Sequence, residues 1–267
     1  MVLTPQPMKT AIPTTSIFGL PIAQFSIADL LKYFQEMILK GRNGNRKQTL
    51  IAYINARSCN LSLQDSKYRA ALAQANLLYL DGNGPRIAAW CAGRSLPPRL
   101  TGADWFDELC GLCEQHGFRV YFLGSKPGVT AELVDRLQVS HPSLEIAGHH
   151  HGYFSPEEEP ALIEAINDTQ PDLLILGLGS PYQEYWMVKC RERLAVPVIW
   201  GGGGVLDYAS GNVKRAPRWM RAIALEWFGR MLIEPRRLTM RYLLGIPMFL
   251  YQSVKWGIST RTSGSRR

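Results

Sequence analysis

An aspartate in a glycine-rich turn is the first residue of this sequence whose type and position suggest chemistry. The segment Asp81-Gly82-Asn83-Gly84 follows an apolar run at 77–80 that predicts a β-strand. A carboxylate held at the end of a strand can act as a general base that deprotonates a hydroxyl group. Asp-Gly and Asn-Gly pairs are also common turn formers, so a purely structural turn explains the same residues. Both interpretations of Asp81 remain open at this point.

A second group of polar side chains lies in the motif GLGSPYQE at 177–184. The spacing predicts a helix start with Ser180 as N-cap, Pro181 as the first helical residue and Gln183 completing a capping box. A helix N-terminus behind a glycine turn also favours phosphate, and an amide can bond sugar hydroxyls or a uracil ring. Gln183 is therefore a candidate for capping, for ligand binding, or for both.

Four consecutive glycines, Gly201 to Gly204, follow a predicted strand at 196–200. Glycine lets the backbone approach a ligand closely, which makes Gly202 and Gly203 binding candidates. Asp207 follows and could either bind the ribose hydroxyls of a nucleotide or cap the next helix. Neither a GxGxxG fingerprint nor a GxxxxGK[ST] motif is present, which argues against a dinucleotide cofactor and against ATP hydrolysis. We expect no cofactor.

The positive charge is concentrated near the end of the sequence. Residues 214–267 hold twelve Lys and Arg against two Glu, a net charge of +10 in a chain whose total is +8. Such asymmetry indicates an anionic partner: phospholipid, a diphosphate or nucleic acid. The stretch 242–258 favours lipid, because it is apolar and aromatic and is flanked by basic residues. It is short and is broken by Gly245, Pro247 and Lys255, which predicts an interfacial segment rather than a spanning helix. No nucleic-acid-reading motif is present, so we expect no nucleic-acid partner.

Cysteine and histidine give little support to redox or metal chemistry. The five cysteines are an odd number scattered through apolar patterns, as is typical of a reducing, cytoplasmic compartment. Cys110 and Cys113 have redox spacing but lie in a helical apolar pattern, which favours buried structural thiols. The run His149-His150-His151 lacks a further ligand at metal spacing, so we expect a solvated turn and no metal site.

Strands alternating with amphipathic helices predict an α/β fold with a Rossmann-like, mostly parallel sheet and flanking helices. In such sheets ligands bind beyond the carboxyl ends of the strands, where the glycine-rich loops fall here. We expect a loose leader at 1–25, an α/β catalytic domain at 26–213, a basic, apolar helical appendage that associates with membranes at 214–258, and a disordered tail at 259–267. The predicted strands are 50–54, 77–80, 120–123, 145–147, 173–178 and 196–200.

Several motifs in the same order resemble the TagA/WecG/CpsF glycosyltransferases of bacteria, glycosyltransferase family 26. The likeness covers about residues 50–242. Its motifs are INARSCNLSLQDSKYRAAL (54–72), YLDGNGPRIAAW (79–90), RLTGADWFDEL (99–109), VYFLGSKPGV (120–129), GHHHGYFSPEE (148–158), LLILGLGSPYQEYW (173–186), GGGGVLDYASGNVKRAP (201–217) and ALEWFGRMLIEPRRLTMRY (224–242).

This resemblance implies roles for individual residues. Asp81 matches the family's proposed catalytic base, with Gly82 beside it, and Asn55 matches the asparagine of a T-x-N pattern whose threonine position is Tyr53 here. Gln183 matches a glutamine of the nucleotide-sugar pocket, with Glu184 as a secondary candidate. Tyr182 stands where relatives often have lysine. Lys214 and Arg215 belong to a G-x-x-KRAP element near the donor site.

The resemblance also implies that the C-terminal appendage closes over the active site at the membrane and adds arginines to it. Without a metal-binding DxD element, positive side chains would have to neutralise the departing diphosphate, and guanidinium groups suit that task. The candidates are Arg230, Arg237 and Arg241. A solvated basic face or a lipid-attracting patch explains each of them as well.

Taken with these residues, the resemblance implies an inverting, metal-independent glycosyltransferase of cell-surface polysaccharide synthesis, peripheral on the inner face of the plasma membrane. It would move a hexose-type sugar (N-acetylmannosamine, its uronic acid, glucose or galactose) from a UDP-sugar to a polyprenyl-diphosphate-linked saccharide. Its other partner would be an anionic membrane surface, and a homo-oligomer is compatible with these features. The alternatives are a non-catalytic membrane-associated scaffold and a basic nucleic-acid-binding protein.

Overall fold

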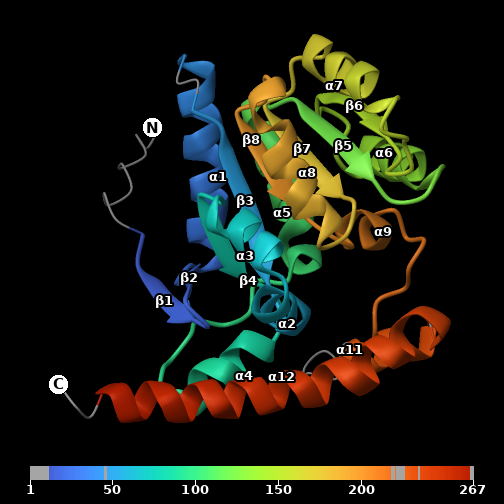
Figure 1. Ribbon diagram of the computed structural model, residues 1–267. Coiled ribbons are helices and arrows are strands. Elements are labelled where there is room, and N and C mark those ends of the chain that lie inside the picture. The colour runs from blue at the N-terminus through green and yellow to red at the C-terminus, as the bar shows by residue number, and fades with distance from the viewer. Residues whose placement is uncertain (1–11, 45–46, 218–219, 221–225, 234, 265–267) are drawn as a thin grey trace.

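A six-stranded parallel β-sheet with helices on both faces forms the centre of the molecule (Figure 1). The computed structural model describes residues 12–44, 47–217, 220, 226–233 and 235–264. The sheet order is β4-β3-β8-β7-β5-β6, and every neighbouring pair is parallel. Its strands are β3 (Thr49–Ile54), β4 (Leu77–Leu80), β5 (Val120–Gly124), β6 (Ile146–His150), β7 (Leu173–Gly177) and β8 (Val198–Gly201). The predicted α/β fold class is confirmed.

Alternate strand residues face opposite sides of the sheet, and each side is covered by its own helices. One apolar cluster joins the first side to α1 (Ile27–Arg42), α5 (Gly102–His116) and α6 (Val129–Ser140). Two further clusters join the second side to α2 (Ala56–Gln64), α3 (Ser66–Ala73), α4 (Gly84–Cys91), α7 (Glu159–Asp168) and α8 (Tyr182–Cys190). A 3₁₀ turn at Arg191–Arg193 and the short α9 (Val205–Ala209) flank β8. The core is therefore a three-layer sandwich.

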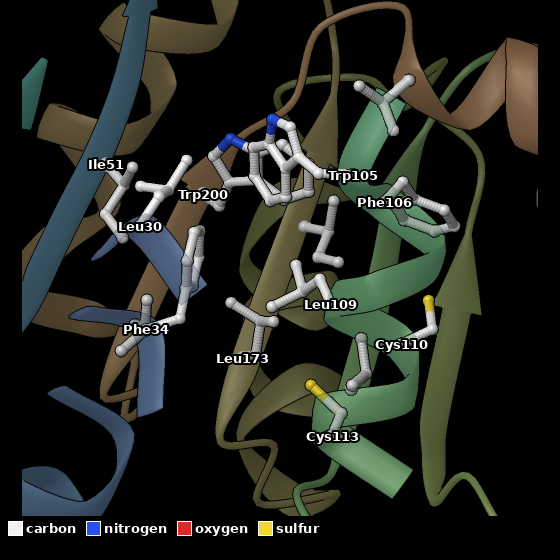
Figure 2. Packing of buried hydrophobic residues seen from close by; sticks show 14 of the residues in the cluster. Leu30, Phe34, Ile51, Trp105, Phe106, Leu109, Cys110, Cys113, Leu173 and Trp200 are labelled. Carbon is white, nitrogen blue, oxygen red and sulfur yellow. The ribbon is translucent and has the colours of Figure 1, made fainter. Parts of the chain in front are cut away.

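Stacked aromatic rings anchor β8, the strand that ends in the four glycines 201–204, which we call the glycine loop. Trp200 of β8 and Trp105 of α5 lie with ring centroids 4.6 Å apart, and Phe34 of α1 lies 5.7 Å from Trp200 (Figure 2). The indole N–H of Trp200 donates to the hydroxyl of Tyr79 at 3.2 Å. Aromatic pairs of this kind add about 0.5–1.5 kcal/mol beyond the apolar area that they bury. They hold the end of β8 firmly under the glycines that follow it.

The two thiols with redox spacing belong to this core. Cys110 and Cys113 are buried on the inner face of α5 (Figure 2), and burial raises the pKa of both thiols. A raised pKa disfavours the reactive thiolate. The prediction of structural thiols is confirmed.

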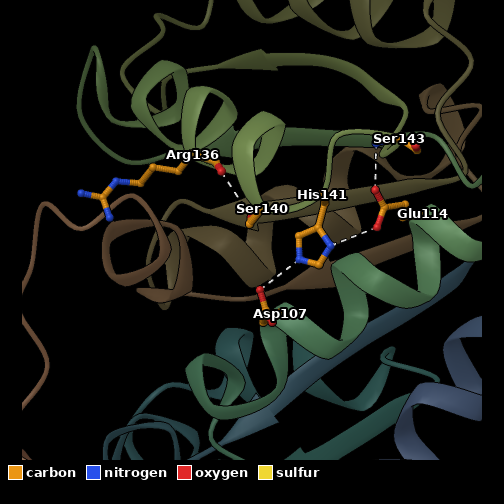
Figure 3. Close-up of polar contacts among 6 residues, drawn as sticks. All are labelled: Asp107, Glu114, Arg136, Ser140, His141 and Ser143. Carbon is orange, nitrogen blue, oxygen red and sulfur yellow. Dashed lines mark hydrogen bonds and ion pairs between the residues drawn. The ribbon is translucent and has the colours of Figure 1, made fainter.

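A histidine ties α5 to the segment that follows α6. The ring of His141 contacts a carboxylate at each nitrogen: Nδ1 lies 3.2 Å from Glu114 and Nε2 lies 3.0 Å from Asp107 (Figure 3). Glu114 also accepts a hydrogen bond from the backbone N–H of Ser143 at 2.8 Å. This cluster lies away from the glycine-rich loops and fixes two helices on the same side of the sheet.

The start of the described chain is not a loose leader. Residues 14–23 form a hairpin of β1 (Thr14–Ile17) and β2 (Leu20–Ala23), and Ile17, Leu20 and Ile22 are buried against the core. The expectation of a loose leader at 1–25 is therefore wrong for this part, because the alternation of apolar residues gives the hairpin a face to bury. The first eleven residues lie outside the described part of the chain.

Within the described residues of the basic C-terminal region, α11 (Glu226–Ile233) and α12 (Pro235–Gly264) lie beneath the sandwich (Figure 1). α12 continues through Pro247 and packs along α4 and α2. It runs on to Gly264, so residues 259–264 are helical where we expected disorder. Packing against two helices stabilises a helix beyond the propensity of its own residues. None of the helices in the described residues is both long and apolar enough to cross a membrane.

The histidine run differs from its predicted conformation. β6 spans Ile146–His150 rather than 145–147, and its parallel pairing with β5 brings His149 and His150 into the sheet. We expected a solvated turn there. Backbone pairing with β5 overrides the turn that the polar residues indicated.

Candidate functional site

The carboxyl ends of the four neighbouring strands β4, β3, β8 and β7 bring the candidate residues together. Because these strands are parallel, their carboxyl ends meet at one edge of the sheet. Asp81 follows β4, Asn55 follows β3, Gly202 follows β8 and Ser180 follows β7. We call this region the carboxyl edge. Residues separated by more than a hundred positions in sequence become neighbours there.

Asp81 and Asn55 form a polar pair at this edge. The side-chain amide of Asn55 donates to Oδ2 of Asp81 at 3.5 Å, and the backbone N–H of Asp81 donates to Ile54 at 2.9 Å. Oδ1 of Asn55 accepts from the backbone N–H of Ser58 at 3.0 Å, which caps α2. The cap fixes the orientation of the amide, so its NH₂ group faces the carboxylate. Both side chains are half-buried and reach the solvent.

The turn after Asp81 depends on its glycines. Gly82 has a φ of +75°, a conformation that glycine adopts readily. A Cβ atom on Gly84 would lie 2.7 Å from the Cβ of Ala56, so the turn approaches α2 closely. The structural interpretation of this motif is correct, and it also explains how Asp81 is held in place. Whether Gly82 contacts a substrate stays a prediction.

The predicted capping box at Ser180 is wrong. α8 begins at Tyr182 with Pro181 as its N-cap residue, one position later than predicted, and no side chain caps it. Ser180 instead donates from Oγ to Oε1 of Glu184 at 2.7 Å. The later start moves Gln183 to the second helical position, from which its side chain enters the core instead of reaching back to Ser180.

Gln183 holds the glycine loop from behind. Its side chain is fully buried, and Oε1 accepts a hydrogen bond from the backbone N–H of Gly203 at 3.1 Å. The N–H groups of Gly202 and Gly203 also donate to Leu176 at 2.9 Å and 3.2 Å. These contacts connect α8, β7 and the glycine loop. Gln183 thereby shapes the carboxyl edge, and direct contact with a ligand stays a prediction.

Glu184 is a buried carboxyl group. It is 2% exposed, and Oε2 has no hydrogen-bond partner within the described residues. Burial raises the pKa of this carboxyl, and the hydrogen bond from Ser180 acts in the opposite direction. The hydrogen bond from Ser180 links Glu184 to the carboxyl edge, and contact of Glu184 with a ligand stays a prediction.

Tyr53, noted in the sequence only as a departure from a threonine, lies at the centre of the carboxyl edge. Its hydroxyl oxygen is 3.3 Å from Oγ of Ser180 and lies 2.5 Å from where a Cβ atom on Gly203 would be. Burial is the main cause that raises the pKa of Tyr53, and the charges of Glu184, Asp81 and Arg241 also act on it. The T-x-N pattern marks the position of Tyr53 but not its contacts, because Ser180 and Gly203 lie in loops distant in sequence.

Of the three candidate arginines in the C-terminal appendage, Arg230, Arg237 and Arg241, only Arg241 has a side chain that the structure describes. It lies on α12 and is half-buried, and its positive charge partly offsets the rise that burial causes in the pKa of Tyr53. The appendage thus brings a cation to the carboxyl edge. Arg230 lies on α11 and Arg237 on α12, but their side chains are outside what the structure describes, so their roles stay predictions.

The remaining candidates lie around the glycine loop. Arg215 forms an ion pair with Asp104 at 2.8 Å and donates to Ala103 at 3.0 Å, which fastens the segment that follows α9 to α5. Lys214 beside it is exposed. Asp207 is half-buried within α9, whose N-cap is Gly204 with no capping side chain, so the capping interpretation of Asp207 is wrong. Ligand contact by Lys214, Arg215 or Asp207 stays a prediction.

A residue that the motif analysis did not single out completes the edge. Arg57, on α2, donates to the backbone carbonyl of Ser180 at 3.2 Å. It therefore supports the same loop that carries the Ser180 contact to Glu184. Within the described residues, no three His, Cys, Asp or Glu side chains are grouped so that they could hold a metal ion.

Comparison with known proteins adds independent findings. The model of the glycosyl transferase WecG/TagA/CpsF family matches residues 15–263. The chain is 28% identical over 242 residues to the N-acetylglucosaminyldiphosphoundecaprenol N-acetyl-beta-D-mannosaminyltransferase of Bacillus subtilis, which covers 91% of each chain. It is 35% identical over 194 residues to a protein of the same name from Bacillus spizizenii, which covers 73% of this chain and 74% of that one.

Proposed function

This chain belongs to the WecG/TagA/CpsF family of glycosyltransferases, and on that basis we propose that it moves a hexose-type sugar from a UDP-sugar to a polyprenyl-diphosphate-linked saccharide. The observation that carries the proposal is the pair of Asp81 and Asn55 at the carboxyl edge. A half-buried carboxylate at the carboxyl end of a parallel strand has the position that a general base needs. The relatives' names specify an N-acetylmannosaminyl group and a diphosphoundecaprenol-linked acceptor, which makes UDP-N-acetylmannosamine the first donor to test.

In the proposed reaction Asp81 takes the proton from the acceptor hydroxyl. The resulting oxygen nucleophile attacks the anomeric carbon of the sugar as the bond from that carbon to the diphosphate breaks, and UDP leaves with the electron pair. Attack from the side opposite the leaving group inverts the anomeric configuration. The Asn55 amide, which faces Asp81, orients the carboxylate for this step.

Positive side chains would stabilise the leaving diphosphate without a metal ion. Arg241 is brought to the carboxyl edge by α12, and Lys214 is exposed beside the glycine loop. Cations placed where negative charge develops in the transition state lower the barrier because they need no rearrangement during the reaction. Arg230 and Arg237 are further candidates for the same role.

The surface of the tail supports a location on the inner face of the plasma membrane. Large apolar side chains are exposed along both tail helices, and the region as a whole is strongly basic. Exposed apolar residues next to cations favour an anionic membrane interface. These side chains are Trp227, Phe228, Leu232, Ile233, Met240, Leu243, Leu244, Leu250, Tyr251, Val254 and Ile258.

Release of UDP from a panel of UDP-sugars tests the proposal. The full chain is incubated with a short-chain prenyl-diphosphate-linked N-acetylglucosamine in the presence of EDTA. We expect release with one donor, a loss of about 10²–10⁴-fold in Asp81→Asn, and no loss in Asp168→Asn, an exposed aspartate at the end of α7. Full activity in Asp81→Asn would overturn the assignment of the base, and a requirement for added divalent metal would overturn the metal-independent mechanism.

A further inference from the structure

The hydroxyl group of Tyr53 occupies the point at the carboxyl edge where β3, the glycine loop and the start of α8 converge. It faces Gly203 on one side and Oγ of Ser180 on another, at 3.3 Å. The side chain is half-buried, and the charges of Asp81 and Arg241 both act on it. A polar group in this position is well placed to contact a molecule bound between Asp81 and the glycine loop.

The surrounding hydrogen bonds fix the direction of the Ser180 proton. Oε1 of Gln183 accepts from the N–H of Gly203, so the other end of the amide must be its NH₂ group. That NH₂ group points to Oε1 of Glu184 at 3.5 Å, and Ser180 donates to the same oxygen at 2.7 Å. Oε1 of Glu184 is therefore an acceptor, and the single hydroxyl proton of Ser180 is committed to it.

The direction of the Tyr53 proton follows from that of Ser180. A serine hydroxyl has one proton, so Ser180 can only accept in its contact with Tyr53. The phenol proton of Tyr53 is then donated to Ser180. The Tyr53 oxygen can therefore only accept a further hydrogen bond. The chain of donors runs from Tyr53 through Ser180 to Glu184, which is buried.

We propose that the Tyr53 hydroxyl accepts a hydrogen bond from a hydroxyl group or an acetamido N–H of the transferred sugar. Ser180 and Glu184 are positioning residues that set this polarity through Tyr53. A site that accepts from the ligand rejects a sugar with no donor at that position, since the acceptor would be left without its partner. Tyr53 is thereby a specificity-determining residue, and the inference rests on the proposed function.

Analogues that separate donating from accepting groups test the polarity. Dissociation constants are measured by calorimetry for the UDP-sugar that the wild type transfers and for its deoxy analogues. Dissociation constants are also measured for the deoxyfluoro analogues and for an analogue in which an ester oxygen replaces the acetamido N–H. Fluorine and ester oxygen accept weakly but cannot donate. We expect one position at which removal of the donor weakens binding about tenfold, equally for the deoxy and the non-donating analogue.

Three variants connect that loss to the proposed chain of hydrogen bonds. Tyr53→Phe should bind the parent sugar about tenfold more weakly and show no further loss with the analogue. Ser180→Ala frees the Tyr53 proton, so the non-donating analogue should regain affinity relative to the deoxy analogue. Ser180→Thr keeps a hydroxyl and should behave as the wild type. Thermal unfolding of each variant shows whether its fold is intact.

The outcomes also separate this inference from the proposed function. If the wild type transfers a sugar but Tyr53→Phe binds every analogue as the wild type does, the inference alone is overturned, and Arg241 or another group uses the Tyr53 oxygen. A non-donating analogue that binds the wild type as well as the parent would also overturn it, since Tyr53 would then be donating. If the wild type binds no UDP-sugar, both the function and this inference fail.

Discussion

The side-chain carbonyl of Gln183 accepts a hydrogen bond from the backbone N–H of Gly203 at 3.1 Å, and this contact joins the start of α8 to the glycine loop after β8. The two residues lie on neighbouring strand-to-helix connections of the parallel sheet. Because Gln183 is fully buried, the contact is shielded from water. The shape of the loop at the proposed donor site therefore depends on a side chain behind it.

Replacing Gln183 should loosen the loop. Gln183→Met keeps most of the volume and loses the hydrogen bond, so we expect about 1–3 kcal/mol less free energy of unfolding and a raised KM for the donor. Gln183→Ala adds a cavity and should cost more. Urea unfolding and donor kinetics measure both effects. Gln138→Ala, an exposed glutamine on α6, is the matched control, and equal effects in it and Gln183→Met would contradict the prediction.

Gly203 should not tolerate a side chain. Its φ is +61°, and an added Cβ would lie 2.5 Å from the Tyr53 hydroxyl, so Gly203→Ala combines backbone strain with a clash. Gly128→Ala is the control for strain alone, because Gly128 has a φ of +90° with no atom within 4 Å of the added Cβ. We expect Gly203→Ala to lower the free energy of unfolding more than Gly128→Ala, as measured in urea. A similar loss in both would show that Tyr53 moves away without cost.

The His141 cluster should make stability depend on pH. Burial lowers the pKa of His141, but its contacts with Asp107 and Glu114 raise it more, so the pKa lies above its ordinary value (Figure 3). A group with a raised pKa in the folded state contributes stability that is fully present below the unfolded pKa, about 6.5, and is lost as pH rises through the folded pKa.

His141→Ala should therefore be more destabilising at about pH 5.5 than at about pH 8.5, since the ion pairs form only with the protonated ring. The free energy of unfolding of the wild type and the variant is measured at both pH values. Asp107→Asn removes one of the two carboxylates and retains a polar side chain of similar size. In that background, the extra destabilisation that His141→Ala causes at about pH 5.5 relative to about pH 8.5 should be smaller but still present. A pH-independent difference would contradict the assigned charge of His141.

Close packing of α12 on α4 should position the appendage. A Cβ on Gly257 would lie 2.6 Å from the carbonyl carbon of Cys91, whereas a Cβ on Gly245 of the same helix would have its nearest neighbour at 3.9 Å. Gly257→Ala should force the two helices apart at a cost of about 1–3 kcal/mol. Gly245→Ala should be neutral or stabilising, since alanine favours a helix by about 1 kcal/mol over glycine.

Turnover should follow the same order, because α4 begins at the turn after Asp81 and α12 carries Arg241. We expect Gly257→Ala to lower kcat and Gly245→Ala to leave it close to the wild type. Urea unfolding and UDP release are measured for both variants. Loss of activity in Gly245→Ala alone would show that the contact with α4 does not position the tail.

Local sequence patterns were sufficient for the parallel sheet and for the position of Asp81. Apolar runs alternating with amphipathic helices predicted six strands, and the structure places a strand at each of them. Such patterns report on a few neighbouring residues, and the carboxyl ends of parallel strands meet wherever the sheet forms. Asp81, Asn55 and the glycine loop could therefore be assigned to one edge from the sequence.

The contacts at that edge required the tertiary structure. α8 begins one residue later than the capping pattern predicted. As a result, the side chain of Gln183 points into the core, and Ser180 donates its hydrogen bond to Glu184. Tyr53 contacts Ser180, which lies 127 positions later in the sequence. Arg241 lies on α12, whose position depends on its packing against α4 and α2. Side-chain partners distant in sequence leave no periodicity to detect. The sequence by itself determined which residues could act, and the packing of strands and helices decided which of them meet.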